Sequence, residues 1–186
     1  MSFRKIINTQ NGSTLFYFEQ LSHNTKLSEF SCSIAEYNNY LNEDALRSQD
    51  DHVALTWLLR ERKSNEIIAY MSLITDAIKL SVSEKELHNL KYPFKTLPAI
   101  KIAKLAVSQS ANQKYKGISS YMINMAISFS HICNRQLFAA RFLTVDADIE
   151  HDSGVLAFYE KNGFISNSEL FNKNRKTISM RKDIYG

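Results

Sequence analysis

The strongest structural signal in the sequence is a β-rich run at residues 99–107 that leads, through a polar connection at 108–116, into a long amphipathic helix. The apolar residues after Gly117 recur at helical spacing and therefore share one face of that helix. They are Ile118, Tyr121, Met122, Met125, Ala126, Phe129 and Ile132. A strand, a tight turn and a helix are thus expected in this order between residues 99 and 132.

The rest of the chain alternates between further β-rich runs and helical patterns. Strands are expected at residues 13–19, 53–59, 67–74, 140–147, 164–166 and 177–182, and helices at 33–48, 83–90 and 154–162. The pattern also predicts a hairpin turn at 60–66, a capping box of Ser33 and Glu36, a loop between Pro93 and Pro98, and a helix end at Gly163. This mixture of hairpins and crossover units predicts one α+β domain over residues 1–186. Its three α/β/α layers would hold a mixed, largely antiparallel twisted sheet of about six to seven strands, with helices on both faces.

The composition is that of a globular chain without a membrane segment. Of the 186 residues, 44% are hydrophobic and 23% are charged, and a chain of this length can fold without a disulfide or a metal. Its apolar runs fall short of the ~20 residues that cross a bilayer, and the N-terminus lacks the features of a secretory signal. Cys32 and Cys133 match no metal or redox spacing. We therefore expect a cytoplasmic protein with no metal and no membrane contact.

Charge is unevenly distributed along the chain. Residues 19–51 contain seven acidic and two basic residues, whereas residues 101–116 contain four lysines and no acidic residue. Residues 161–186 contain six basic and two acidic residues. Such a distribution allows a polyanionic ligand to bind on the basic side, but on charge alone a set of solvated faces is the simpler explanation.

The turn before the long helix has the features of an anion site. The first amides of a helix have no intrahelical acceptor, and the helix dipole favours negative charge there. Gly117 and the small residues Ser119 and Ser120 would let a pyrophosphate approach the backbone, with Lys114 and Lys116 beside it. The segment is neither a Walker A loop nor a dinucleotide fingerprint, and the alternative is that Gly117 merely starts the helix.

Two motifs identify a family resemblance. The strand end Leu105-Ala-Val107 precedes a loop that closes with Gly117-Ile-Ser119, and a later segment reads Phe158-Tyr-Glu-Lys-Asn-Gly-Phe164. Together they resemble the GNAT superfamily of acyl-CoA-dependent N-acetyltransferases. Within that superfamily, residues 30–33, 44–46, 54–58 and 68–73, and Pro98 before the strand, are similar to the toxin-type proteins of bacterial toxin–antitoxin operons.

The resemblance implies acetyl-CoA as co-substrate and assigns residues to it. The backbone of Leu105, Ala106 and Val107 would bind the pantetheine arm. The pyrophosphate loop would comprise Gln113, Lys114, Tyr115, Lys116, Gly117, Ile118 and Ser119. Lys114 and Ser119 depart from the usual Gln or Arg and Gly or Ala of that loop. Asp152 stands where the family often has Asn, so it is assigned to the cofactor site, with capping of the next helix as the open alternative.

The resemblance also implies a catalytic residue. Tyr159 is expected to be the general acid that protonates the CoA thiolate, since a phenol with a pKa near 10 remains a donor at neutral pH. Its alternative role is that of an aromatic core residue beside Phe158. Asp76, Glu84 and Glu86 are acidic residues near strand ends, but nothing in the sequence marks one of them as a general base.

The toxin-type branch acetylates the α-amine of aminoacyl-tRNA, which makes that amine the expected acceptor and an antitoxin an expected partner. A basic surface could contact the nucleic acid, and its candidate residues are Lys101, Lys104, Lys173, Arg175, Lys176 and Arg181. The alternatives are an acetyltransferase for a small-molecule amine or a protein lysine, and an inactive binding module that retains the fold. A homodimer stays an open expectation.

Overall fold

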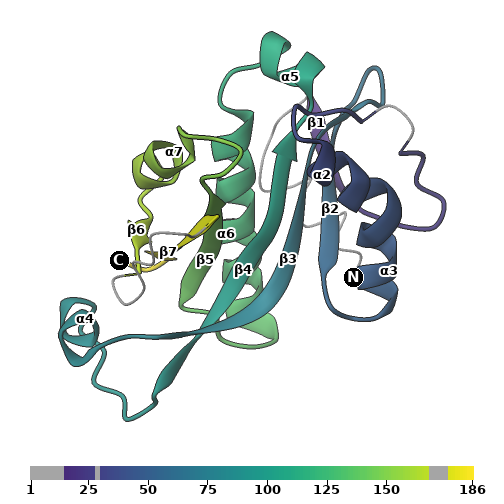
Figure 1. Ribbon diagram of the computed structural model, residues 1–186. Helices are drawn as coiled ribbons and strands as arrows, with labels where there is room; N and C mark the ends of the chain where they lie inside the picture. Colours follow the sequence, from purple (N-terminus) through teal and green to yellow (C-terminus); the bar gives the residue numbers. More distant parts are fainter. Residues whose placement is uncertain (1–14, 28–29, 168–175) are drawn as a thin grey trace. The chain divides into compact units, whose positions relative to one another are not determined.

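The computed structural model describes residues 15–27, 30–167 and 176–186, and Figure 1 shows its helices and strands. The strands are β1 (Phe16–Gln20), β2 (Leu55–Glu61), β3 (Ile67–Lys79), β4 (Thr96–Val107), β5 (Phe142–Asp148), β6 (Ile165–Ser166) and β7 (Thr177–Asp183). The helices are α2 (Ala35–Asn39), the π-helix η1 (Tyr40–Asp44), α3 (Ala45–Asp50), α4 (Val82–Leu87), α5 (Gln109–Lys114), α6 (Ile118–Gln136) and α7 (Val155–Lys161). The chain divides into a first compact unit, residues 1–73 and 104–122, and a second, residues 74–103 and 123–186.

The strand topology confirms the expected α+β fold. Within the described residues, seven strands follow the order β1-β2-β3-β4-β5-β7-β6, and β3 and β4 contribute residues to both units. The pairs β1–β2, β2–β3, β5–β7 and β6–β7 are antiparallel, whereas β4 and β5 are parallel. The sheet is therefore mixed and largely antiparallel, and the predicted hairpin of β2 and β3 is confirmed.

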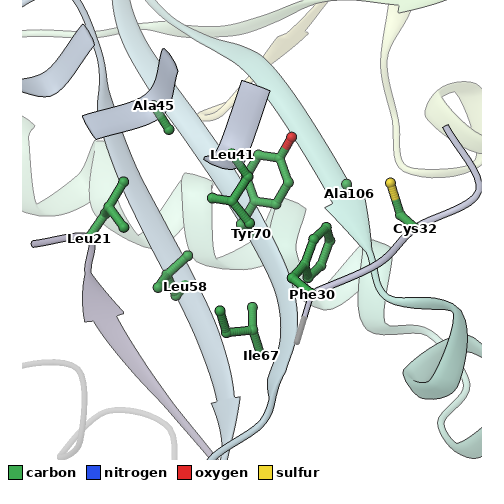
Figure 2. Close-up of a cluster of buried hydrophobic side chains, with 9 residues drawn as sticks. All are labelled: Leu21, Phe30, Cys32, Leu41, Ala45, Leu58, Ile67, Tyr70 and Ala106. Atoms are coloured by element: carbon green, nitrogen blue, oxygen red, sulfur yellow. The ribbon is translucent and has the colours of Figure 1, made fainter. Parts of the chain in front are cut away.

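In the first unit, helices cover both faces of the sheet. One face carries a core cluster made of Leu21, Phe30, Cys32, Leu41, Ala45, Leu58, Ile67, Tyr70 and Ala106, which Figure 2 shows. The cluster includes Leu41 of η1, Ala45 of α3 and Leu58 of β2. Side chains alternate along a strand, so Leu59 points to the face opposite to that of Leu58. Phe18 is paired with Leu59 and therefore lies on this opposite face as well. There its ring lies 6.1 Å from that of Tyr121 in α6.

Truncation of Leu41 tests this core. Leu41 is fully buried, so we expect Leu41→Ala to lower the free energy of unfolding by about 2–5 kcal/mol through lost burial and a residual cavity. The matched control is Leu87→Ala in α4, where the leucine is 80% exposed and the change should stay within about 0.5 kcal/mol. Equilibrium denaturation of both variants measures the two costs, and equal costs would contradict the assigned packing.

The predicted capping box at Ser33 is wrong. The helix begins at Ala35 after Ile34, which makes no side-chain cap, and the Glu36 carboxylate instead accepts from Lys104 Nζ at 2.6 Å. A capping box does form later in the chain, at α4. There Ser81 Oγ accepts from the Glu84 amide at 3.2 Å, and Glu84 Oε2 accepts from the Ser81 amide at 2.8 Å. The short helix expected at 83–90 is thus confirmed as α4, which runs from Val82 to Leu87.

Two connecting segments also differ from expectation. Pro98 lies inside β4 rather than at the end of a loop. The pairing of β4 with β5 begins at Ala99, so the missing N–H of Pro98 breaks no hydrogen bond of that ladder. The polar connection at 108–116 contains a helix, α5. Its start is capped by Ser108, whose side-chain oxygen accepts from the Ala111 amide at 3.2 Å.

The second unit packs α7 against β5. Gly163, with φ +81°, ends this helix in the left-handed conformation, as predicted. A second core cluster contains Ile78, Leu80, Leu97, Ala99 and Phe142. Within the part of the chain that the structure describes, no helix is long and apolar enough to span a bilayer.

Candidate functional site

The candidate anion loop lies wholly in the first unit, between β4 and α6 (Figure 1). The end of β4 is held in place on two sides. The Ser108 amide donates to the Ile68 carbonyl, and the Gln109 amide donates to the Ser31 carbonyl, both at 2.9 Å. After α5 the chain turns extended at Tyr115, whose amide donates to the Ala111 carbonyl at 2.8 Å. The loop therefore starts from a fixed strand end.

Gly117 joins the loop to α6. Its φ of +78° is a left-handed conformation that an L side chain rarely adopts. Its carbonyl accepts from the Tyr121 amide at 2.9 Å, so the helix starts directly after it. A Cβ placed on Gly117 would meet no atom within 4 Å, which leaves open space before the first amides of α6. Those amides, the helix dipole and the open approach suit a phosphate group.

The predicted cofactor residues differ in exposure. Gln113, Lys114, Lys116 and Gly117 are exposed, and Leu105, Val107, Tyr115 and Ser119 are half-buried. Ala106 and Ile118 are buried, with 6% and 5% exposure. The side chain of Ala106 belongs to the core cluster, so this residue can reach a ligand only through its backbone. The structure thus brings the strand end and the whole loop together in one unit.

The structure adds a carboxylate that sequence reasoning missed. Glu61, at the end of β2, accepts from Lys114 Nζ at 2.7 Å, from the Tyr115 hydroxyl, and from Ser64 Oγ at 2.6 Å. The hydrogen bond from Lys114, followed by those from Ser64 and Tyr115, lowers the pKa of Glu61 to about 2. The same contact raises the pKa of Lys114. Lys114 is therefore committed to a carboxylate, whereas Lys116 has no acidic partner among the residues that the structure describes.

Tyr159 lies in the second unit, on α7. It is 6% exposed, and its ring contacts those of Phe158 and Phe164 with centroid distances of 5.0 and 5.2 Å. Burial raises the pKa of its hydroxyl above the ordinary 10, so the phenol stays protonated at physiological pH. Within the described residues, no hydrogen bond engages that hydroxyl. The proton is therefore available to a ligand that reaches it.

Asp152 organises the turn before α7 but does not cap it. Its Oδ1 accepts from the Gly154 amide at 2.8 Å, while the N-cap position is Gly154 itself, which has no side-chain cap. The capping alternative is therefore wrong in its strict form. The role of Asp152 at a cofactor stays a prediction.

Two of the carboxylates considered as general bases have structural partners. Asp76 Oδ2 accepts from Thr144 Oγ1 at 2.6 Å. Glu84 caps α4 and also binds Arg181 Nη2 at 2.7 Å, and this contact and its cap lower the pKa of Glu84 despite its burial. Both side chains are therefore engaged in contacts within the fold.

The candidate basic surface is largely neutralised. Lys173 and Arg175 lie outside the described residues. The other four cations each bind a carboxylate: Lys101 to Asp146 at 2.7 Å, Lys104 to Glu36 at 2.6 Å, Lys176 to Glu150 at 2.9 Å and Arg181 to Glu84 at 2.7 Å. Arg181 is also 3% exposed, so it cannot contribute to a surface. These four residues therefore form no unpaired basic patch.

Across residues 15–27, 30–167 and 176–186, no three His, Cys, Asp or Glu side chains gather in a way that could hold a metal ion.

Several solved structures share the fold of this chain. No protein-family model matches the chain, and no curated protein matches its sequence. A solved structure of a bacterial toxin has a TM-score of 0.75 at 14% identity and covers 92% of each chain. AtaT complexed with acetyl-methionyl-tRNAfMet has a TM-score of 0.71 at 18% identity, covering 88% of this chain and 93% of AtaT. A tyrosine-to-phenylalanine mutant of AtaT, bound to the C-terminus of the antitoxin AtaR and acetyl-CoA, has a TM-score of 0.69 at 16% identity, covering 91% and 94%.

Proposed function

We propose that the chain is an acetyl-CoA-dependent N-acetyltransferase that transfers the acetyl group directly from the thioester to a primary amine. The observation that carries the proposal is the extent of the fold match, about nine tenths of both chains, to AtaT solved with acetyl-CoA. The β4–loop–α6 segment supports it independently, because the loop offers free amides and open space to a phosphate.

In this proposal, acetyl-CoA supplies an activated acetyl group, and the first unit binds it. The backbone of Leu105, Ala106 and Val107 holds the pantetheine arm and polarises the thioester carbonyl through an N–H. The pyrophosphate lies against the loop from Gln113 to Ser119, where the first amides of α6 donate to it. Lys116, exposed and without an acidic partner among the described residues, neutralises part of its charge.

Tyr159 acts as the general acid. The neutral amine attacks the thioester carbonyl carbon, a C–N bond forms and the C–S bond breaks. The hydroxyl of Tyr159 gives its proton to the departing thiolate, and the proton lost by the amine returns to solvent, from which Tyr159 is reprotonated. The raised pKa of this phenol keeps it in the donor form before each turnover.

The α-amine of aminoacyl-tRNA is the proposed acceptor. Among the structural neighbours, AtaT has been solved with acetyl-methionyl-tRNAfMet. An α-amino group has a pKa of about 8, so a useful fraction is neutral without a base, whereas a lysine amine near 10.4 needs one. The structural engagement of Asp76 and Glu84 favours the acceptor that requires no base. An antitoxin is the proposed protein partner, by analogy with the AtaR complex of AtaT.

Incubation of the full chain with labelled acetyl-CoA and a bulk aminoacyl-tRNA mixture tests the proposal. We expect calorimetric binding of acetyl-CoA and label in the tRNA fraction. Binding with label only in small amines or protein lysines would replace the acceptor and keep the enzyme. Absence of acetyl-CoA binding would overturn the enzyme and favour a binding module.

A further inference from the structure

The turn between β2 and β3, which carries Glu61, is closed by backbone hydrogen bonds. The Glu61 amide donates to the Glu66 carbonyl at 3.0 Å, and the Glu61 carbonyl accepts from the Asn65 amide at 2.9 Å. Asn65 is itself held in the left-handed conformation, with φ +63°, and its carbonyl accepts from Arg60 Nη1 at 2.6 Å. The carboxylate of Glu61, 9% exposed, therefore projects from a turn whose backbone is closed on both sides.

The partners of Glu61 are the two residues at which α5 ends. Lys114 is the last residue of α5 and Tyr115 is its C-cap. The Tyr115 ring also meets that of Phe16 in β1 edge-on, with centroids 5.0 Å apart. Fixing both side chains on the hairpin fixes the direction in which the chain leaves α5 toward Lys116 and Gly117.

We propose that Glu61 is a positioning residue for the acetyl-CoA site, which holds Lys114 and Tyr115 so that Lys116, Gly117 and the first amides of α6 face the pyrophosphate. The inference rests on the proposed function. It assigns Lys114 an anchoring role and leaves the direct charge on the pyrophosphate to Lys116. Charge-assisted hydrogen bonds of this kind are geometrically specific, which suits an anchor.

The direction in which Glu61→Gln changes the affinity for acetyl-CoA separates a positioning role of Glu61 from a direct contact of Lys114 with phosphate. Glu61→Gln keeps the shape of the side chain and an acceptor for the Tyr115 hydroxyl, but removes the charge that binds Lys114. If Lys114 contacted phosphate directly, its release would tighten acetyl-CoA binding. If Glu61 positions the loop, the same release loosens the loop and weakens binding.

The experiment compares binding of acetyl-CoA and of S-acetylpantetheine, which lacks the pyrophosphate, by calorimetry on the full chain. For Glu61→Gln we expect the Kd of acetyl-CoA to rise roughly fivefold or more, as for two coupled sites. The Kd of S-acetylpantetheine should stay within about twofold of the wild type, since that ligand does not reach the loop. The ratio of the two affinities separates positioning from general destabilisation, which would weaken both.

Leu41→Ala is the matched control. Leu41 is fully buried in the core cluster of the first unit, so its truncation destabilises that unit without removing a group that holds Glu61, Lys114 or Tyr115. We expect it to lower the melting temperature and leave the ratio of the two affinities unchanged. Tyr115→Phe removes a single donor to Glu61 and serves where Glu61→Gln does not fold, with a smaller loss in the same direction.

The outcomes distinguish a failure of the proposed function from a failure of the positioning role of Glu61. A wild-type chain that binds no acetyl-CoA overturns the proposed function and this inference together. A wild type that binds, with unchanged or tighter binding in Glu61→Gln or Tyr115→Phe, overturns the positioning role alone. Lys114→Met should reproduce Glu61→Gln, and the double variant should show no further loss. An additive loss would contradict a shared anchor.

Discussion

Tyr159→Phe is expected to lower the turnover of acetyl transfer by about 100-fold while leaving the Kd of acetyl-CoA near the wild-type value. The substitution removes only the hydroxyl, and the ring contacts with Phe158 and Phe164 stay in place. Because no hydrogen bond from the described residues engages that hydroxyl, its removal leaves no buried partner unsatisfied. Stability should therefore change little, which is unusual for a tyrosine that is 6% exposed.

Tyr70→Phe provides the opposite pattern as a control. Tyr70 is fully buried, and its hydroxyl donates to the Tyr37 carbonyl at 2.8 Å, so this variant should lose about 1–3 kcal/mol of stability and keep its turnover. Initial rates at saturating acetyl-CoA, calorimetry and thermal unfolding of the two variants measure the contrast. Wild-type turnover in Tyr159→Phe would remove the tyrosine from the mechanism.

The pH profile of the wild type is a second readout of the same role. Burial raises the pKa of Tyr159 above its ordinary value of 10.0, so the donor form persists throughout the range below pH 10. Turnover should rise with pH as the acceptor amine loses its proton, near pH 8 for an α-amine. It should then remain level to about pH 10. A fall in turnover between pH 8 and 9 would contradict a proton donor with this pKa.

The strongest sequence signals were local, and these predicted the structure best. The apolar stripe after Gly117 predicted α6 because one face of a helix needs only 3.6-residue spacing to be recognised. Gly163 predicted the end of α7 because a single glycine is enough to favour the left-handed conformation that ends a helix. Both signals depend on neighbours within a few positions, and so does the β2–β3 hairpin.

The capping boxes show why equal local signals can have different outcomes. Ser33-x-x-Glu36 and Ser81-x-x-Glu84 have the same spacing, yet only the second forms. In the first, the Asn38 side chain accepts from the Cys32 amide at 2.8 Å and donates to the Cys32 carbonyl at 3.0 Å, which orders the chain before Ile34. Glu36 is drawn to Lys104, 68 residues away. The choice depends on tertiary partners that no local pattern contains.

The contact between Glu61 and the loop could not be predicted from the sequence for the same reason. Glu61 and Lys114 are 53 residues apart, and nothing in either segment marks the other. Their meeting follows from the position of β2 beside β3 and of β3 beside β4, because that order brings the hairpin turn to the strand end from which α5 starts. The sequence predicted Gly117 directly before the long helix, which the structure confirms, and it placed the charge of Lys114 beside the expected anion, whereas Lys114 binds Glu61.

Gly117→Glu is expected to raise the Kd of acetyl-CoA by at least about 100-fold, which corresponds to about 2.7 kcal/mol. Two effects act in the same direction. The φ of +78° is strained for glutamate, as for most residues with a Cβ, so the loop shifts away from its present path. The new carboxylate also projects into the open space before α6 and repels the pyrophosphate where the helix amides would bind it.

A series at the same position separates these two effects. Asn tolerates the left-handed conformation, so Gly117→Asn should retain most of the affinity, and Gly117→Ala, which has only the backbone strain, should lie between Asn and Glu. Calorimetric titration of acetyl-CoA into each variant gives the order directly. If Ala binds as poorly as Glu, backbone conformation dominates; if Ala binds like Asn, repulsion dominates. Wild-type affinity in Gly117→Glu would mean that the pyrophosphate does not lie at the start of α6. A carboxylate beside those amides would repel any second anion that binds to the same donors.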